Sequence, residues 1–171
     1  QIPVVLDQAY FESLNIDDKA IAWLKEFDNL IITRTFSKAY GLAGLRVGYS
    51  VCSPTIADLI NRIREPFNVN HTAQKAAICA LSDLDYLKKS RKVNDSGLRQ
   101  LEQGFIRLKL NYIPSHANFI AVKFSNAMEI YNSLLKEGVI VRPVEMDNFL
   151  RISIGTSEEN TFLLKALEKI L

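Results

Sequence analysis

One stretch, residues 34–49, most constrains how this chain can fold. It follows an apolar run, residues 30–32, that predicts a buried strand, and it leads into a second apolar run, residues 47–52. Between the runs stand one lysine, Lys38, two glycines and then Arg46. A lysine at the mouth of a sheet, beside hydroxyls and an arginine, favours covalent carbonyl chemistry next to a phosphate. By itself the stretch is equally compatible with an ordinary glycine-rich turn that carries solvated charges.

The composition narrows the class of protein. With 171 residues and 48% hydrophobic content, the chain is long enough for one domain, or one and a half, with a real core. A net charge of +2 without a long basic run argues against nucleic acid as a main partner. The two cysteines lack C-x-x-C spacing and the two histidines form no ligand pattern, so we expect reduced thiols and no metal. No signal peptide or membrane-length apolar run occurs, which favours a cytoplasmic enzyme or binding domain and no membrane partner.

The residues before this stretch predict another strand. Residues 2–6 are apolar and β-branched, and the run ends at Asp7. A buried carboxylate is costly unless paired, and ligands bind at the carboxyl ends of strands in open α/β sheets. Asp7 is therefore interpreted either as a turn cap or as a carboxylate that faces a cation. Because the chain begins at Gln1 directly with a buried-strand pattern, we expect it to be the interior of a longer protein.

Four helices are predicted before residue 111. The first covers residues 15–27 with Asp17 as N-cap, and the second begins at Pro54. Asn70 is expected to cap the third, and residues 83–110 predict a long helix of the kind that bridges two domains. The inner faces expected for the first two helices consist of Ile21, Leu24 and Phe27, and of Ile56, Leu59, Ile60 and Ile63.

The remaining residues predict a second, smaller α/β unit. Strands are expected over residues 112–113, 118–124, 139–142 and 149–154. An amphipathic helix ends at Gly138, and a capping box over 156–159 opens the last helix. The predicted division is residues 1–85, a connecting helix over 86–110, and a small C-terminal domain over 111–171.

Several motifs carry a family resemblance. Asp7-Gln-Ala-Tyr10, Ser37-Lys38 and the glycine-containing residues 41–49 resemble the fold type I aminotransferases that depend on pyridoxal phosphate. Together with residues 68–74, they are most similar to the histidinol-phosphate aminotransferase family. Residues 114–119 and 150–156 look like the small domain of that family. The resemblance covers the whole chain and implies the C-terminal part of the large domain followed by a small α/β C-terminal domain.

The resemblance also implies a cofactor and its contacts. Pyridoxal 5′-phosphate would act as the electron sink. Lys38 would bond to its aldehyde and later move a proton. Asp7 would pair with the ring nitrogen and Tyr10 would donate to the ring oxygen, while Ser37 and Arg46 would hold the phosphate.

Substrate residues are implied in the same way. Arg151 and Arg142 match arginines that bind the glutamate carboxylate and the substrate phosphate, and guanidinium groups suit both anions. Asn118 is a further candidate for the pocket, or it holds a turn. Each arginine is alternatively a surface residue in a salt bridge. The implied reaction moves an amino group between histidinol phosphate and 2-oxoglutarate in histidine biosynthesis, in a homodimer when the protein is full length.

Other functions share these motifs. They are an aromatic amino acid aminotransferase, a phosphothreonine decarboxylase of similar fold, a non-catalytic sensor attached to a DNA-binding module, and a plain phosphate- or nucleotide-binding module. The N-terminal half of the family contributes further cofactor contacts. We therefore expect these 171 residues alone to bind the cofactor poorly and not to turn over.

Overall fold

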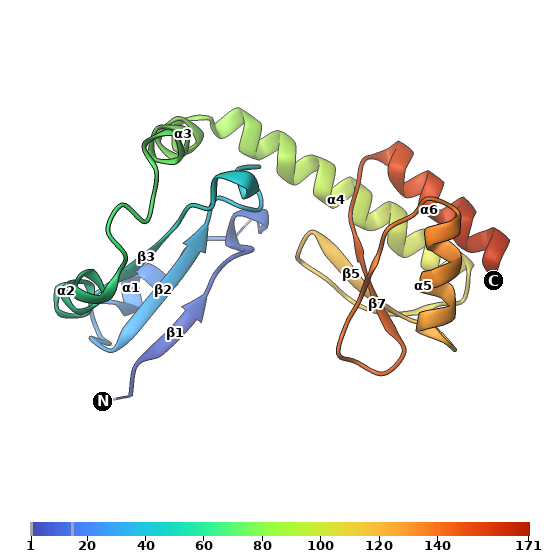
Figure 1. Cartoon of the computed structure of the whole chain (residues 1–171), viewed down its shortest axis with the longest axis horizontal. Helices are drawn as coiled ribbons and strands as arrows, with labels where there is room; N and C mark the ends of the chain where they lie inside the picture. The colour runs from blue at the N-terminus through green and yellow to red at the C-terminus, as the bar shows by residue number, and fades with distance from the viewer. Residues whose placement is uncertain (1, 15) are drawn as a thin grey trace. The chain divides into compact units, whose positions relative to one another are not determined.

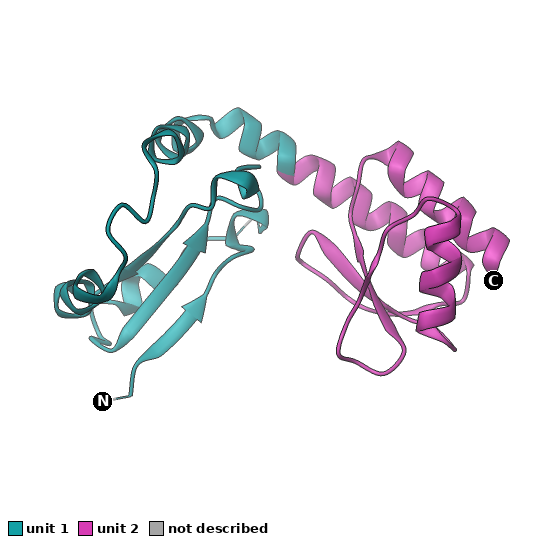
Figure 2. Ribbon diagram, in the orientation of Figure 1, with its two compact units in different colours: residues 1–90 teal, residues 91–171 magenta. Residues whose placement is uncertain are grey.

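The computed structural model describes residues 2–14 and 16–171. They form a chain of alternating strands and helices (Figure 1) that divides into two compact units, Gln1–Ser90 and Arg91–Leu171 (Figure 2). The division falls within one long helix, α4 (Leu84–Arg107), whose extent agrees with the predicted long helix. Each unit has its own sheet and its own apolar clusters.

The first unit contains three strands, β1 (Val4–Asp7), β2 (Leu30–Thr35) and β3 (Gly48–Cys52), in that order across the sheet. β1 runs parallel to β2, with Asp7 opposite Thr33, and β3 runs antiparallel to β2. The three predicted strands are thus confirmed. Because β1 and β2 are parallel, their carboxyl ends lie at the same edge of the sheet, where open α/β sheets bind ligands.

Burial in this sheet departs from the prediction at β1. Leu30 and Ile32 of β2 are buried and pack with Ala20. Val4 and Val5 of β1, in contrast, are 51% and 60% exposed. Within the described residues β1 pairs only with β2 and lies at the edge of the sheet, although its sequence has the pattern of a buried strand.

The first helix is much shorter than predicted. α1 covers Ala20–Trp23 and is preceded by Lys19, so Asp17 is not its N-cap. Residue 15, where the predicted helix began, lies outside the described residues. Asp18, which lies shortly before α1, forms a long-range ion pair with Arg34 of β2. Ala20 and Leu24 pack inward as the core face, whereas Ile21 and Phe27 of the predicted face are 39% and 52% exposed.

The next two helices follow their local signals. α2 (Pro54–Ile63) begins with its proline, and α3 (His71–Ser82) is capped by Asn70, whose side chain accepts a hydrogen bond from Ala73 N at 2.8 Å. The cap prediction is confirmed. The apolar stripe of α2 forms but is not an inner face, since Leu59 and Ile63 are 52% and 84% exposed.

The second unit is a sheet covered by helices. Its four strands lie in the order β4-β5-β7-β6, and all neighbouring pairs are antiparallel. Asn126 and Thr156 cap its helices, and Thr156 forms the predicted capping box with Glu159. The elements are β4 (Asn111–Ile113), β5 (Phe119–Lys123), α5 (Ala127–Lys136), β6 (Arg142–Pro143), β7 (Phe149–Ser153) and α6 (Ser157–Ile170).

The strand predicted over residues 139–142 is mostly wrong. Val139 N instead donates to Leu134 O at 2.8 Å and closes the end of α5. Only Arg142 and Pro143 pair with β7. Proline has no N–H to give to a ladder, which suits this short strand at the edge of the sheet.

Close packing joins α4 to α6. A Cβ atom placed on Gly104 would lie 2.3 Å from Leu164 Cδ2, and one on Gly97 would lie 2.6 Å from Ile154. The absence of a side chain at these two glycines therefore leaves the space that the Leu164 and Ile154 side chains fill against α4. Asn160 is 1% exposed in this interface, and it bonds Gly155 N and O at 3.0 and 3.1 Å.

Candidate active site

A cavity of about 350 Å³ opens at the carboxyl ends of β1 and β2. Its position follows from the parallel pairing of the two strands, and the turn after β2 closes its other side. Four of the residues implied for the cofactor meet here, from positions up to 39 apart in the sequence. The lining residues are Asp7, Ala9, Thr33, Arg34, Thr35, Ser37, Lys38 and Arg46.

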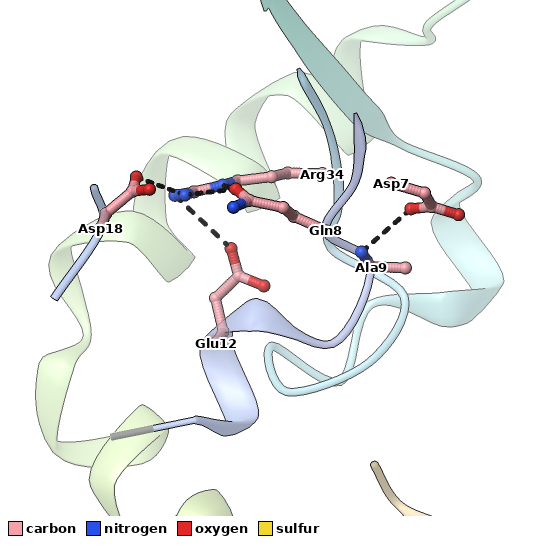
Figure 3. Close-up of polar contacts among 6 residues, drawn as sticks. All are labelled: Asp7, Gln8, Ala9, Glu12, Asp18 and Arg34. Atoms are coloured by element: carbon pink, nitrogen blue, oxygen red, sulfur yellow. Dashed lines mark hydrogen bonds and ion pairs between the residues drawn. The ribbon is translucent and has the colours of Figure 1, made fainter. Parts of the chain in front are cut away.

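Asp7 lies at the last position of β1 and is exposed rather than buried. Its Oδ1 accepts hydrogen bonds from Ala9 N at 3.0 Å, drawn in Figure 3, and from Thr33 Oγ1 at 3.3 Å. The carboxylate is thus exposed among the described residues, and it caps its own turn. These contacts still orient the carboxylate at the edge of the cavity.

Lys38 and Tyr10 come together across the same edge of the sheet. Lys38 is half-buried, and its Nζ lies 5.4 Å from the centroid of the Tyr10 ring. This is within the roughly 6 Å over which a cation is attracted to a ring face. Tyr10 is not among the lining residues of the cavity, yet it stands beside the amine that lines it.

Ser37 and Arg46 form a pair of donors at the turn. Arg46 has a φ of +53°, in the left-handed region, at the end of the short 3-10 helix η2 (Ala43–Leu45). Its Nη1 donates to Ala43 O at 2.8 Å and to Ser37 Oγ at 3.4 Å. A hydroxyl and a guanidinium held this close provide the donors that a phosphate requires.

Sequence reasoning missed Arg34, which also lines the cavity. Its guanidinium contacts four residues that follow β1, and Figure 3 shows three of them, Gln8, Glu12 and Asp18. Burial lowers the pKa of Arg34, but its hydrogen bonds to Tyr49 and Asp18 and the attraction of Asp18 outweigh this, so the pKa is raised. Arg34 stands between two threonines near the end of β2, and the residues around it give no local signal that its side chain is buried.

The candidate substrate residues all belong to the second unit. Arg142 and Arg151 stand directly opposite each other in the β6–β7 ladder. The Arg151 guanidinium lies 4.2 Å from the centroid of the Phe119 ring. Asn118 Oδ1 is buried and accepts no hydrogen bond from the described residues. Only the two arginines thus share the sheet, since Asn118 directly precedes β5, and a pair of guanidinium groups suits an anionic ligand.

Two further features, metal clusters and membrane spans, concern residues 2–14 and 16–171, the part of the chain that the structure describes. This part of the chain has no cluster of three or more histidine, cysteine, aspartate or glutamate side chains placed to hold a metal ion. Each helix described here is also too short or too polar to span a membrane.

The chain belongs to the aminotransferase class I and II family, whose model matches residues 1–167. It is 53% identical to a histidinol-phosphate aminotransferase of Methylobacillus flagellatus, over 100% of this chain and 48% of that protein. The same values hold for histidinol-phosphate aminotransferase 2 of Pseudomonas aeruginosa. The chain spans about half the length of the curated relatives it matches.

Solved structures agree with this family and with the predicted fold. The histidinol-phosphate aminotransferase of Sinorhizobium meliloti, in complex with pyridoxal-5′-phosphate, aligns with a TM-score of 0.90 and 33% identity. The alignment covers 98% of this chain and 48% of that one. An L-threonine-O-3-phosphate decarboxylase of Porphyromonas gingivalis aligns with a TM-score of 0.78 and 26% identity, over 96% and 54%. The predicted α/β fold and the resemblance on which it rested are confirmed.

Proposed function

We propose that this chain supplies the lysine-bearing part of a pyridoxal phosphate site in an aminotransferase. The observation that carries the proposal is the convergence of Asp7, Ser37, Lys38 and Arg46 on one cavity. The donor set fits the group: a hydroxyl and a guanidinium suit a phosphate, and an amine suits an aldehyde. The complex of the Sinorhizobium meliloti enzyme with this cofactor supports the assignment.

The residues take complementary roles in this proposal. When bound, the cofactor supplies an electron sink for charge that develops at the substrate α-carbon. Lys38 would bond to the cofactor aldehyde through its amine, with loss of water, and once the substrate amine has displaced it the freed amine would carry the transferred proton. Asp7 keeps the ring nitrogen protonated, and Tyr10 donates to the ring oxygen. Ser37 and Arg46 fix the phosphate and so hold the ring in place.

The proposed amino donor is histidinol phosphate and the acceptor is 2-oxoglutarate. Like charges opposite each other in a ladder repel, so Arg142 and Arg151 are best accommodated by an anion that lies between or over them. The phosphate of the donor and the carboxylates of the acceptor are such anions. The names of the relatives support this choice, and with it a role in histidine biosynthesis. A cytoplasmic location is part of the same proposal. A homodimer of the complete protein belongs to the same proposal.

The test uses the complete polypeptide that carries these residues. Pyridoxal phosphate bonded to a lysine amine has a visible absorbance band distinct from that of the free aldehyde, and Lys38→Ala should abolish this band, whereas Lys75→Ala on α3 should not. Amino transfer is then compared for histidinol phosphate and phenylalanine. Faster transfer from histidinol phosphate supports the proposal, and preference for phenylalanine would favour the aromatic aminotransferase.

A second candidate, decarboxylation of a phosphorylated amino acid, is favoured by one observation. The Porphyromonas gingivalis decarboxylase shares the fold at 26% identity, and its named substrate also carries a phosphate. Release of carbon dioxide from O-phosphothreonine, without amino transfer to 2-oxoglutarate, would replace the proposed reaction with this one.

A further inference from the structure

Arg34 is the centre of a largely buried polar network beside the cavity (Figure 3). Its side chain is 12% exposed and forms ion pairs with Asp18 and, at 4.0 Å, with Glu12. Its Nε and Nη2 donate to Gln8 Oε1 at 3.1 and 2.8 Å. The guanidinium also lies over the Phe11 ring, 4.2 Å from the centroid. One side chain from β2 therefore holds several points of the segment that follows β1.

The contacts of Arg34 stand on both sides of Tyr10 in the sequence. Gln8 precedes Tyr10 by two residues, and Phe11 and Glu12 follow it directly. The backbone is held at the same place, because Gln8 N donates to Thr33 O at 2.9 Å. The position of the Tyr10 ring beside Lys38 thus depends on a segment that is fastened to β2 largely through Arg34.

A guanidinium suits this task better than an ammonium group. It is planar and carries five N–H donors, so it can donate to an amide, pair with carboxylates and stack on a ring at once. A lysine keeps the charge but offers a compact point charge without the planar face. The carboxylates of Glu12 and Asp18 are buried to 6% and 23% exposure, so the cation also compensates two nearby negative charges.

We propose that Arg34 is a positioning residue that sets the place of Tyr10, and through it the ring side of the cofactor site. Arg34 acts on the segment after β1, and Tyr10 makes the contact with the ring. This inference rests on the proposed function, since Tyr10 has a ring to contact only if pyridoxal phosphate binds there. It predicts that the effect of Arg34 on cofactor binding passes through the Tyr10 side chain.

A double-mutant cycle in the complete polypeptide tests this dependence. The affinity for pyridoxal phosphate is measured by equilibrium titration for the wild type, Arg34→Lys, Tyr10→Phe and the double variant. We expect Arg34→Lys to weaken binding roughly tenfold in the wild-type background and by less than about twofold in the Tyr10→Phe background, as for coupled residues. Arg62→Lys is the matched control, because Arg62 pairs with Asp58 on the exposed surface of α2 and should leave the affinity unchanged.

The possible outcomes separate the two proposals. The inference about Arg34 is overturned if Arg34→Lys binds the cofactor as tightly as the wild type, or if it loses the same affinity in both backgrounds. The proposed function still stands in either case, provided that Lys38→Ala removes the absorbance band. Absence of cofactor binding by the wild type would overturn both. Circular dichroism and cofactor-free thermal unfolding establish that each variant is folded. If Arg34→Lys does not fold, Glu12→Gln replaces it in the cycle, and the same dependence on Tyr10 is required.

Discussion

Arg142 and Arg151 face each other across the β6–β7 ladder, with Arg142 exposed and Arg151 half-buried over the Phe119 ring. Like charges directly opposite each other destabilise a strand pair. The protein therefore maintains a local repulsion at the place where the proposed substrate anion binds. An anion that lies over the pair would convert this repulsion into binding energy.

We predict that Arg142→Met raises the stability of the protein in phosphate-free buffer by about 0.5 kcal/mol, because it removes the cross-strand repulsion. The same variant should lose most of the stabilisation that added phosphate gives the wild type. Thermal unfolding with and without phosphate, at constant ionic strength, measures both effects. Arg107→Met, which breaks an exposed ion pair with Glu168, is the control. If phosphate stabilises Arg142→Met as much as it stabilises the wild type, the anion site is excluded.

Gly104→Ala should destabilise the second unit by about 1–3 kcal/mol, because overpacking of a tight contact costs that much. The added Cβ would lie 2.3 Å from Leu164 Cδ2, so α4 and α6 would have to move apart. Gly44→Ala provides the comparison, since a Cβ there meets nothing within 4 Å. Urea unfolding of the two variants should show the loss in Gly104→Ala alone, and similar midpoints would contradict the packing argument.

Asn160→Leu should cost about 1–3 kcal/mol, because it leaves the buried backbone groups of Gly155 without their partners. Asn160 N–H and carbonyl groups now bond Gly155 O and N at 3.1 and 3.0 Å, in a site where the side chain is 1% exposed. Gln100→Leu, which removes a partner at 3.3 Å, should cost less. The free energies of unfolding of the two variants are measured and compared. A larger loss in Gln100→Leu than in Asn160→Leu would show that Gly155 N and O have other hydrogen-bond partners.

The 171-residue chain by itself is predicted to bind pyridoxal phosphate weakly and to show no amino transfer. The family resemblance implies that a ring-stacking aromatic residue and further phosphate donors come from residues other than those of this sequence. Titration of the purified chain with the cofactor, followed by its visible absorbance, checks the prediction. Robust transfer from histidinol phosphate by this chain alone would refute it, while the complete polypeptide serves as the positive control.

Features that depend on neighbouring residues were predictable from the sequence. The Asn70 cap and the Thr156 capping box need only residues three positions away, and both are present. Lys38 and Arg46 were found because a short motif joins them, and both line the cavity. In each case, the residues that carry the signal lie within eight sequence positions of one another.

Features that depend on distant residues were not predictable. The helix expected over residues 15–27 is present only as Ala20–Trp23, and Asp18, shortly before it, pairs with Arg34, sixteen positions later. Arg34 escaped notice because an arginine next to a threonine reads as a solvated residue until its buried partners are known. The strand expected over 139–142 shrank because its pairing depends on which residues of β7 it meets. The local sequence pattern does not predict contacts between residues that are far apart in the chain.

The left-handed backbone at Arg46 makes that position unusually intolerant of replacement. Glycine or asparagine would accept a φ of +53° with little strain, but neither carries a charge. Lysine would keep a charge, but it would lose the fork that reaches Ala43 O and Ser37 Oγ together. A saturation library at this codon should therefore be almost empty of functional variants, whereas one at Ser37, whose φ is not in that region, should retain threonine.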